Sequence, residues 1–165
     1  MKHAIAVGDP RAADVASLLA ASEAYAHSLY PAESVHMLDV ASLGTPAVSF
    51  LVARSTDGVA EGCGALVVND DGSAELKRMF VAPAARRRGL GAAILERLEA
   101  EARARGVRVI RLETGVAQPE AIALYRRFGY CPCEPFDDYR PDPLSLFMEK
   151  VLARTQPIDC VSPPA

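Results

Sequence analysis

The chain lacks the features that mark secreted, membrane and nucleic-acid-binding proteins. Its 165 residues contain no apolar run long enough to span a membrane, and Gly8, Asp9 and Pro10 interrupt the apolar start of the chain, which therefore makes a poor signal peptide. The net charge of −3 argues against broad binding to nucleic acid. These absences predict a cytoplasmic protein that binds neither nucleic acid nor a membrane.

Cysteine is scarce and irregularly placed. The four cysteines have neither the spacing of a disulfide framework nor that of a zinc site, and no histidine lies near the Cys131-Pro-Cys133 step to complete a zinc set. We therefore expect no bound metal ion. Half of the residues are hydrophobic, enough for a chain of this length to form one compact domain with its own core.

Glycine- and proline-marked turns divide the chain into alternating elements of an α/β domain. The apolar patterns predict strands over 4–7, 48–54, 62–68, 74–81, 107–112, 130–136 and 145–151, and helices over 10–29, 34–43, 90–105 and 119–128. We expect residues 1–152 to form the domain and the proline-rich residues 153–165 to form a flexible C-terminal tail.

The most informative segment runs from Val81 to Leu95 and reads VAPAARRRGLGAAIL. Gly89 and Gly91 remove the Cβ atoms that would keep an anion from the backbone. The helix that follows directs its unpaired N–H groups and the positive end of its dipole at the same place. Three preceding arginines add cationic donors. This combination predicts a site for a ligand that carries a diphosphate.

Three kinds of phosphate site compete for this turn. A nucleotide P-loop needs a Gly-Lys-Ser/Thr ending, which is absent. A dinucleotide fold would use Gly89, Gly91 and Glu113, which ends the next predicted strand at about the ribose-binding distance. However, Ile94 occupies the third glycine position and the chain is too short for a second nucleotide-binding half.

The third kind of site fits the turn and its surroundings. Arg86-x-x-Gly89-x-Gly91 resembles the acyl-CoA pyrophosphate loop of the GNAT superfamily of N-acetyltransferases, and the flanking segments ELKRMFV, RLET and AIALYRRFGY match that superfamily at the same spacing. The resemblance implies a GNAT fold of the α/β (α+β) class. Such a fold is a mixed, mostly antiparallel sheet of about six to seven strands with a splayed central parallel pair, flanked by about four helices. It also implies acetyl-CoA as co-substrate, bound by Met79, Phe80, Val81, Arg86, Arg87, Arg88, Gly89, Leu90, Gly91, Ala92, Gln118 and Tyr125.

Two side chains are catalytic candidates. Glu75 has a spacing to the loop similar to that of the general-base glutamate in histone-type members, and its alternative role is a strand-face ion pair. Tyr125 matches the tyrosine of the LY-x-x-x-G-F/Y motif, which the resemblance makes the acid for the leaving thiolate, and its alternative role is core packing. A backbone N–H at Met79 is implied as oxyanion donor. Gln118 stands where members often carry an asparagine that contacts the CoA arm.

The acceptor site is expected on the first helices and the final hairpin. The candidate acceptor-binding residues are Tyr30, Glu33, His36 and Tyr139. Carboxylates and tyrosines there suit a cationic amine, whereas an inward Arg140 would suit an amino-acid carboxylate. The surrounding motifs resemble a bacterial small-molecule-type subgroup of unassigned substrate. We expect direct transfer of an acetyl group to a small amine or amino-acid-like substrate in a ternary complex. The alternatives are a non-catalytic acyl-CoA sensor and a protein or peptide N-acetyltransferase, and a homodimer is compatible with all three.

Overall fold

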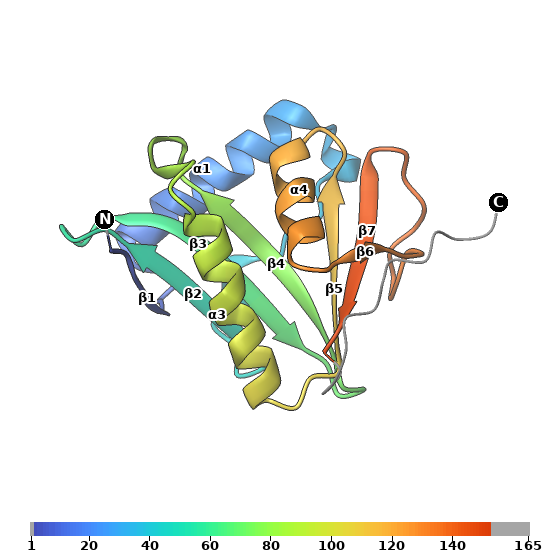
Figure 1. The fold of residues 1–165 in the computed structure, drawn as a ribbon. Helices are drawn as coiled ribbons and strands as arrows, with labels where there is room; N and C mark the ends of the chain where they lie inside the picture. The colour runs from blue at the N-terminus through green and yellow to red at the C-terminus, as the bar shows by residue number, and fades with distance from the viewer. Residues whose placement is uncertain (1, 153–165) are drawn as a thin grey trace.

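A seven-stranded mixed sheet organises the computed structural model, which describes residues 2–152 (Figure 1). The strand order is β1-β2-β3-β4-β5-β7-β6, and every neighbouring pair is antiparallel except β4–β5. The strands are β1 (Ala4–Val7), β2 (Val48–Arg54), β3 (Ala60–Val68), β4 (Ser73–Val81), β5 (Val109–Gly115), β6 (Cys131–Pro132) and β7 (Ser145–Val151). The helices are α1 (Ala13–Leu29), α2 (Val40–Leu43), α3 (Leu90–Ala104) and α4 (Pro119–Arg127), with short 3-10 turns at Ala32–Ser34 and Pro83–Ala85.

The helices cover both faces of the sheet and bury two apolar clusters. Helix α3 presents a stripe at helical spacing, formed by Leu90, Ile94, Leu98 and Ala102, and all four side chains are buried in the larger cluster. Val15, Leu18 and Leu19 of α1 lie in the second cluster with residues of β2, β3 and β4. The predicted α3 stripe is therefore the main helical contribution to the core.

The two central parallel strands separate along their length. β4 and β5 pair only from Ser73 and Val109 to Leu76 and Leu112, and both strands continue beyond that point without pairing to each other. Figure 1 shows their arrows close together at the N-terminal ends and diverging toward the C-terminal ends. The expected splayed parallel pair is thus present, and it leaves a gap edged by backbone groups.

A β-bulge lies on the same stretch of β4. Cys63 pairs with Phe80 and Ala65 pairs with Lys77, so Gly64 of β3 lies opposite two residues, Arg78 and Met79. Arg78 has a positive φ of 58°, which is uncommon for a residue with a side chain. The bulge therefore interrupts the ladder beside the gap, at the strand position predicted to supply the oxyanion donor.

Several expected elements differ from those observed. Residues 34–43 do not form one helix, because Val35 is extended and the short helix α2 begins only after Asp39, whose carboxylate accepts a hydrogen bond from the Ser42 N–H. The strand expected over 130–136 is reduced to β6. The tail expected over 153–165 lies outside the described residues, and within them no helix is long and apolar enough to cross a membrane.

Candidate active site

A turn rich in unpaired backbone donors precedes α3. The N–H groups of residues 87–92 have no hydrogen-bond acceptor among the described residues, so six consecutive donors are available at the start of a fifteen-residue helix. Gly89 is the N-cap residue and has a φ of 75°, a left-handed conformation that costs glycine nothing. Arg87 and Arg88 are exposed beside this turn. The turn has the donors and the charge that a diphosphate requires.

Arg86 occupies a different position from the two arginines that follow it. Its Nε donates to the Val81 carbonyl oxygen at 3.0 Å, and its guanidinium lies 4.9 Å from the Tyr25 ring centre and 5.7 Å from that of Phe80. The predicted diphosphate ligand Arg86 therefore also connects the turn to α1. The side chain of Leu90 is buried in the core, so this residue can meet a ligand only through its backbone.

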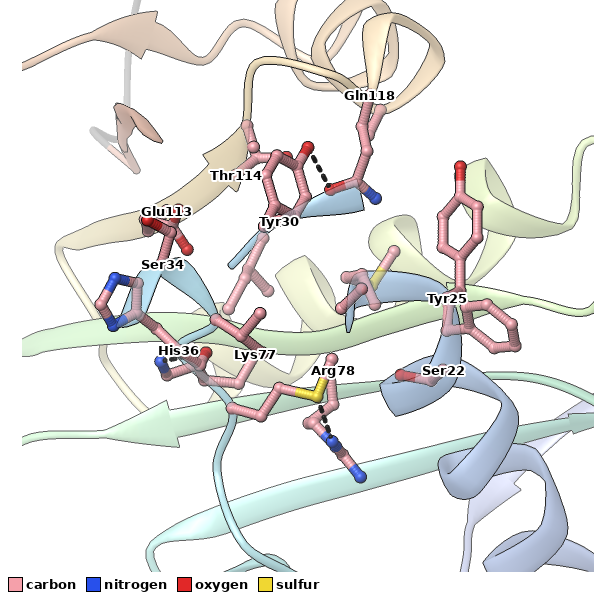
Figure 2. Close-up of a pocket in the computed structure, with 18 of the residues that line it drawn as sticks. Ser22, Tyr25, Tyr30, Ser34, His36, Lys77, Arg78, Glu113, Thr114 and Gln118 are labelled. Carbon is pink, nitrogen blue, oxygen red and sulfur yellow. Dashed lines mark hydrogen bonds between the residues drawn. The ribbon is translucent and has the colours of Figure 1, made fainter. Parts of the chain in front are cut away.

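An inner cavity of about 130 Å³ lies at the open end of the gap between β4 and β5 (Figure 2). Residues from α1, β4, β5 and α4 line it, so it joins segments that are far apart in the chain. The predicted site residues that line it are Tyr30, His36, Met79, Phe80, Gln118 and Tyr125. The fold thus brings the predicted acid Tyr125 and the predicted oxyanion donor Met79 to one cavity.

Tyr125 is held tightly in this cavity. Its side chain is 6% exposed and its ring lies edge-on to Tyr130, with ring centres 5.8 Å apart. Burial raises the pKa of Tyr125 above its ordinary value, and the nearby Glu113 carboxylate raises it further. The phenol therefore stays protonated at neutral pH. Tyr125 packs in the core, as its alternative role requires, and it also lines the cavity, so its position is compatible with the predicted role as an acid.

A carboxylate, that of Glu113, also lines the inner cavity. From the sequence, Glu113 was a candidate only for the ribose ligand of a dinucleotide fold. It lies near the C-terminal end of β5, where Ile110 and Leu112 alternate into the core and Glu113 faces the other side of the sheet. Burial raises the pKa of Glu113, while the nearby Ser145 hydroxyl and the charges of His36 and Lys77 oppose the rise. A partly buried carboxylate with a raised pKa is suited to accept a proton near neutral pH.

An outer cavity of about 740 Å³ adjoins the inner one, and the two share Val35, His36, Met37 and Lys77. Glu75 lines the outer cavity and not the inner one. It accepts a hydrogen bond of 2.5 Å from the Tyr139 hydroxyl and lies 3.3 Å from the Lys77 ammonium. The predicted catalytic pair Tyr125 and Glu75 is therefore divided between two cavities, and Glu75 has the strand-face ion pair that the sequence offered as its alternative role.

The predicted acceptor-binding residues are also divided. His36 lines both cavities and contacts the Tyr139 ring edge-on, with centroids 5.3 Å apart, while Glu33 and Tyr139 line only the outer cavity. Tyr30 lines only the inner cavity: its hydroxyl donates a hydrogen bond to the Gln118 amide oxygen, which Figure 2 shows, and accepts one from the Ala117 N–H.

Glu113 and Arg78 also line the inner cavity, and only Glu113 carried a sequence signal that could have singled it out. Glu113 is the one acidic residue in the apolar strand RLET and stands twelve positions before Tyr125. Arg78 is 7% exposed, donates through Nη2 to Glu23 at 3.0 Å and through Nη1 to the Met37 sulfur, and has no partner at Nε. Its burial needs the tertiary fold and could not be predicted from strand position alone.

The splayed mixed sheet, the donor-rich turn before α3 and the cavity between them define a class of protein that transfers acyl groups from coenzyme A thioesters. Residues 14–130 match the family model of the acetyltransferase (GNAT) family, and the chain belongs to this family. It is an acetyl-CoA-dependent acyltransferase of the GNAT superfamily, as the loop and its flanking strands indicated. The predicted fold class is confirmed as well.

Proteins named as acetyltransferases are similar to most of the chain. An IAA acetyltransferase of Azospirillum brasilense is 50% identical over 139 residues, which are 84% of this chain and 90% of that protein. The uncharacterized N-acetyltransferase YsnE of Bacillus subtilis is 40% identical over 124 residues, 74% of this chain and 82% of that protein. A solved structure from Klebsiella pneumoniae, described as an acyl-CoA N-acyltransferase, is 40% identical, with a TM-score of 0.78 and coverage of 92% of this chain and 98% of that one.

Proposed function

We propose that this enzyme moves an acetyl group from acetyl-CoA to the primary amine of a small molecule by direct attack in a ternary complex. The observation that carries the proposal is the meeting of Glu113 and Tyr125 in the inner cavity, at the open end of the β4–β5 gap. A base and an acid are the two proton-transfer groups that this reaction requires. Their position suits a thioester lying in the gap.

The diphosphate of acetyl-CoA fits the turn before α3. Six free N–H donors and the exposed Arg87 and Arg88 would hold the phosphates, and Arg86 would add its remaining Nη donors. The unpaired backbone of β4 and β5 would hold the amide groups of the arm that follows. A GNAT structure from Thermoplasma acidophilum was solved with coenzyme A, and it shares this fold at a TM-score of 0.72 and 17% identity.

The side chains of the inner cavity divide the proton transfers between them. The Glu113 carboxylate would take a proton from the ammonium form of the acceptor, directly or through water, so that the amine can attack the acetyl carbon. A C–N bond forms and the C–S bond breaks, while the Met79 N–H beside the bulge would stabilise the oxyanion. The Tyr125 hydroxyl would then protonate the departing thiolate, and the second proton lost from the nitrogen as the tetrahedral intermediate collapses would restore the phenol, directly or through water. Glu75, the base proposed from the sequence, remains the competing candidate.

The outer cavity supports a cationic small-molecule acceptor. Five carboxylates line it against one lysine and one arginine, and these acidic residues are Glu33, Glu75, Asp137, Asp138 and Asp142. No cysteine among the described residues lines either cavity, which favours direct transfer over a thiol-bound acyl intermediate. The name of the Azospirillum relative, an IAA acetyltransferase, is consistent with a small acceptor.

A thiol-release assay tests the proposal. Acetyl-CoA would be offered with a panel of diamines, amino acids, amino-acid amides and short peptides, using the wild type and Tyr125→Phe. We expect release with at least one small amine, turnover about tenfold or more lower in Tyr125→Phe, and nearly unchanged coenzyme A binding. Tyr130→Phe, a matched change at a buried core tyrosine outside the cavity, should leave turnover unchanged.

Other outcomes of this assay would contradict the proposal. Coenzyme A binding without thiol release on any acceptor would favour the sensor alternative. Release on peptides but on no small amine would favour the peptide N-acetyltransferase alternative. Equal turnover in the wild type and Tyr125→Phe would remove Tyr125 from the mechanism.

A further inference from the structure

The side chain of Tyr30 extends from the C-terminal end of α1 to the C-terminal end of β5, one of the two strands that border the gap. This residue is the C-cap residue of α1, yet its side chain is 8% exposed and lies over Gly115, the last residue of β5. A Cβ atom on Gly115 would lie 1.9 Å from the Tyr30 hydroxyl oxygen and 2.0 Å from Cζ. Only a glycine leaves room for this phenol, so the end of β5 and the ring of Tyr30 form one packed unit.

The Tyr30 hydroxyl makes two hydrogen bonds to the turn between β5 and α4. It accepts from the Ala117 N–H at 3.1 Å and donates to the Gln118 Oε1 at 3.3 Å. The phenol proton has no other acceptor among the described residues, so the amide oxygen of Gln118 must face Tyr30. Burial raises the pKa of Tyr30 above its ordinary value, so this hydroxyl is a donor at neutral pH.

The amide nitrogen of Gln118 consequently points away from Tyr30. Figure 2 shows the oxygen of Gln118 directed at the phenol and the nitrogen on the opposite side. Gln118 lines the inner cavity and is the N-cap residue of α4, yet its side chain makes no capping bond to that helix. The NH₂ group has no acceptor among the described residues. It is therefore an oriented donor without a partner at the edge of the gap.

We propose that Tyr30 is a positioning residue for the co-substrate: its hydroxyl fixes the Gln118 amide so that the NH₂ group donates to a carbonyl oxygen of the acetyl-CoA arm. This inference rests on the proposed function, because it places that arm in the β4–β5 gap. Tyr30 thereby acts on the acyl donor, whereas the sequence predicted it to bind the acceptor. Gln118 is longer than asparagine, and the phenol holds the longer side chain in one orientation.

Calorimetric binding of coenzyme A and steady-state kinetics with acetyl-CoA test this role. Tyr30→Phe keeps the ring over Gly115 and removes only the hydroxyl. The loss of one oriented hydrogen bond predicts that the Kd for coenzyme A and the KM for acetyl-CoA rise about 3- to 10-fold. The KM for the acceptor should stay within about twofold, because the hydroxyl faces the β5–α4 turn.

A double-mutant cycle separates positioning from independent contact. Gln118→Ala should weaken coenzyme A binding by about the same factor as Tyr30→Phe, and the double variant should bind no more weakly than Gln118→Ala alone. Tyr130→Phe is the matched control and should bind coenzyme A as the wild type does. Gly115→Ala should weaken binding as well, because its methyl group displaces the phenol.

Three results would overturn the inference. Unchanged coenzyme A affinity in Tyr30→Phe removes the role, and losses that multiply in the double variant show that Tyr30 acts apart from Gln118. A wild type that does not bind coenzyme A also overturns it. The binding measurement needs no turnover, so a protein that binds coenzyme A with the expected coupling but acetylates no amine would refute the proposed reaction alone.

Discussion

Glu113→Gln is the sharpest test of which carboxylate serves as the base. Glutamine keeps the shape of the side chain but cannot accept a proton from an ammonium group. General bases contribute about 10²- to 10⁴-fold to rates, which corresponds to about 3–5 kcal/mol of activation free energy. Because Glu113 and Tyr125 line the same cavity, we expect kcat to fall by that factor. The KM for acetyl-CoA should change little, since the diphosphate site lies at the turn before α3.

The raised pKa of Glu113 gives the test two further readouts. Only the ionised carboxylate can act as a base, so kcat/KM in the wild type should fall as pH drops through this pKa, which lies above that of an ordinary glutamate. A raised carboxyl pKa also means that ionisation weakens the fold: the stability contribution is present below the unfolded-state pKa and is lost as pH rises through the folded-state value. Glu113→Gln should therefore be at least as stable as the wild type at neutral pH.

Variants of two other glutamates, measured beside Glu113→Gln, show whether the loss of activity is specific to Glu113. Thiol release would be measured from pH 5.5 to 9 for Glu113→Gln, Glu75→Gln and Glu120→Gln, with thermal unfolding of each. Glu75 lines the outer cavity, and we expect less than a tenfold loss there, while the exposed Glu120 on α4 should be neutral. A Glu113→Gln enzyme within threefold of the wild type, beside a large loss in Glu75→Gln, would refute the assignment.

Two further predictions concern the diphosphate turn and the core. Gly89→Ala and Gly58→Ala place a methyl group at φ values of 75° and 82° with nothing within 4 Å, so each should lose about 1–2 kcal/mol of unfolding free energy. Only Gly89→Ala should raise the Kd for coenzyme A, by about tenfold in calorimetry, and equal affinities would contradict the placement of the diphosphate. Lys150→Met removes the ammonium 2.8 Å from the buried Glu99 carboxylate and leaves it only Arg103 at 3.4 Å, so it should cost about 1–3 kcal/mol in urea unfolding. Adding Glu99→Gln should restore much of that loss, and no recovery would argue that the lost ammonium is not what the buried carboxylate needs.

Local signals predicted the elements that depend on neighbouring residues. The strand expected over 48–54 matches β2 at both ends, and the stripe from Leu90 to Ala102 placed α3 within a residue. The glycines, the arginines and the start of the helix are all local features of the turn before α3. The sequence therefore predicted its free backbone N–H donors. The helix predicted over 34–43 was wrong. Within this segment Met37 contacts Arg78, 41 positions away, and no local hydrophobic period encodes such a contact.

The site could be predicted only as far as its parts are local. Tyr125 carries its own motif, and it lines the inner cavity as its proposed role requires. The partition of Glu75 and Glu113 between two cavities depends on where β4 and β5 separate, which the sequence did not locate. Tyr30 was predicted to bind the acceptor, but its partner Gln118 lies 88 positions away and becomes visible only in the fold.

Because β4 and β5 separate, the stability of the folded chain should depend on the concentration of the ligand that occupies the gap between them. Beyond Leu76 and Leu112 these strands form no ladder with each other, so the centre of the sheet is held by fewer bonds than a continuous sheet would have. A ligand that occupies the gap and binds only the folded chain adds RT ln(1 + [L]/Kd) to the unfolding free energy, about 2.7 kcal/mol at a hundredfold excess over Kd. The enzyme should consequently resist heat and proteolysis best when its acyl donor is abundant, and depletion of the donor should shorten its survival before it limits turnover.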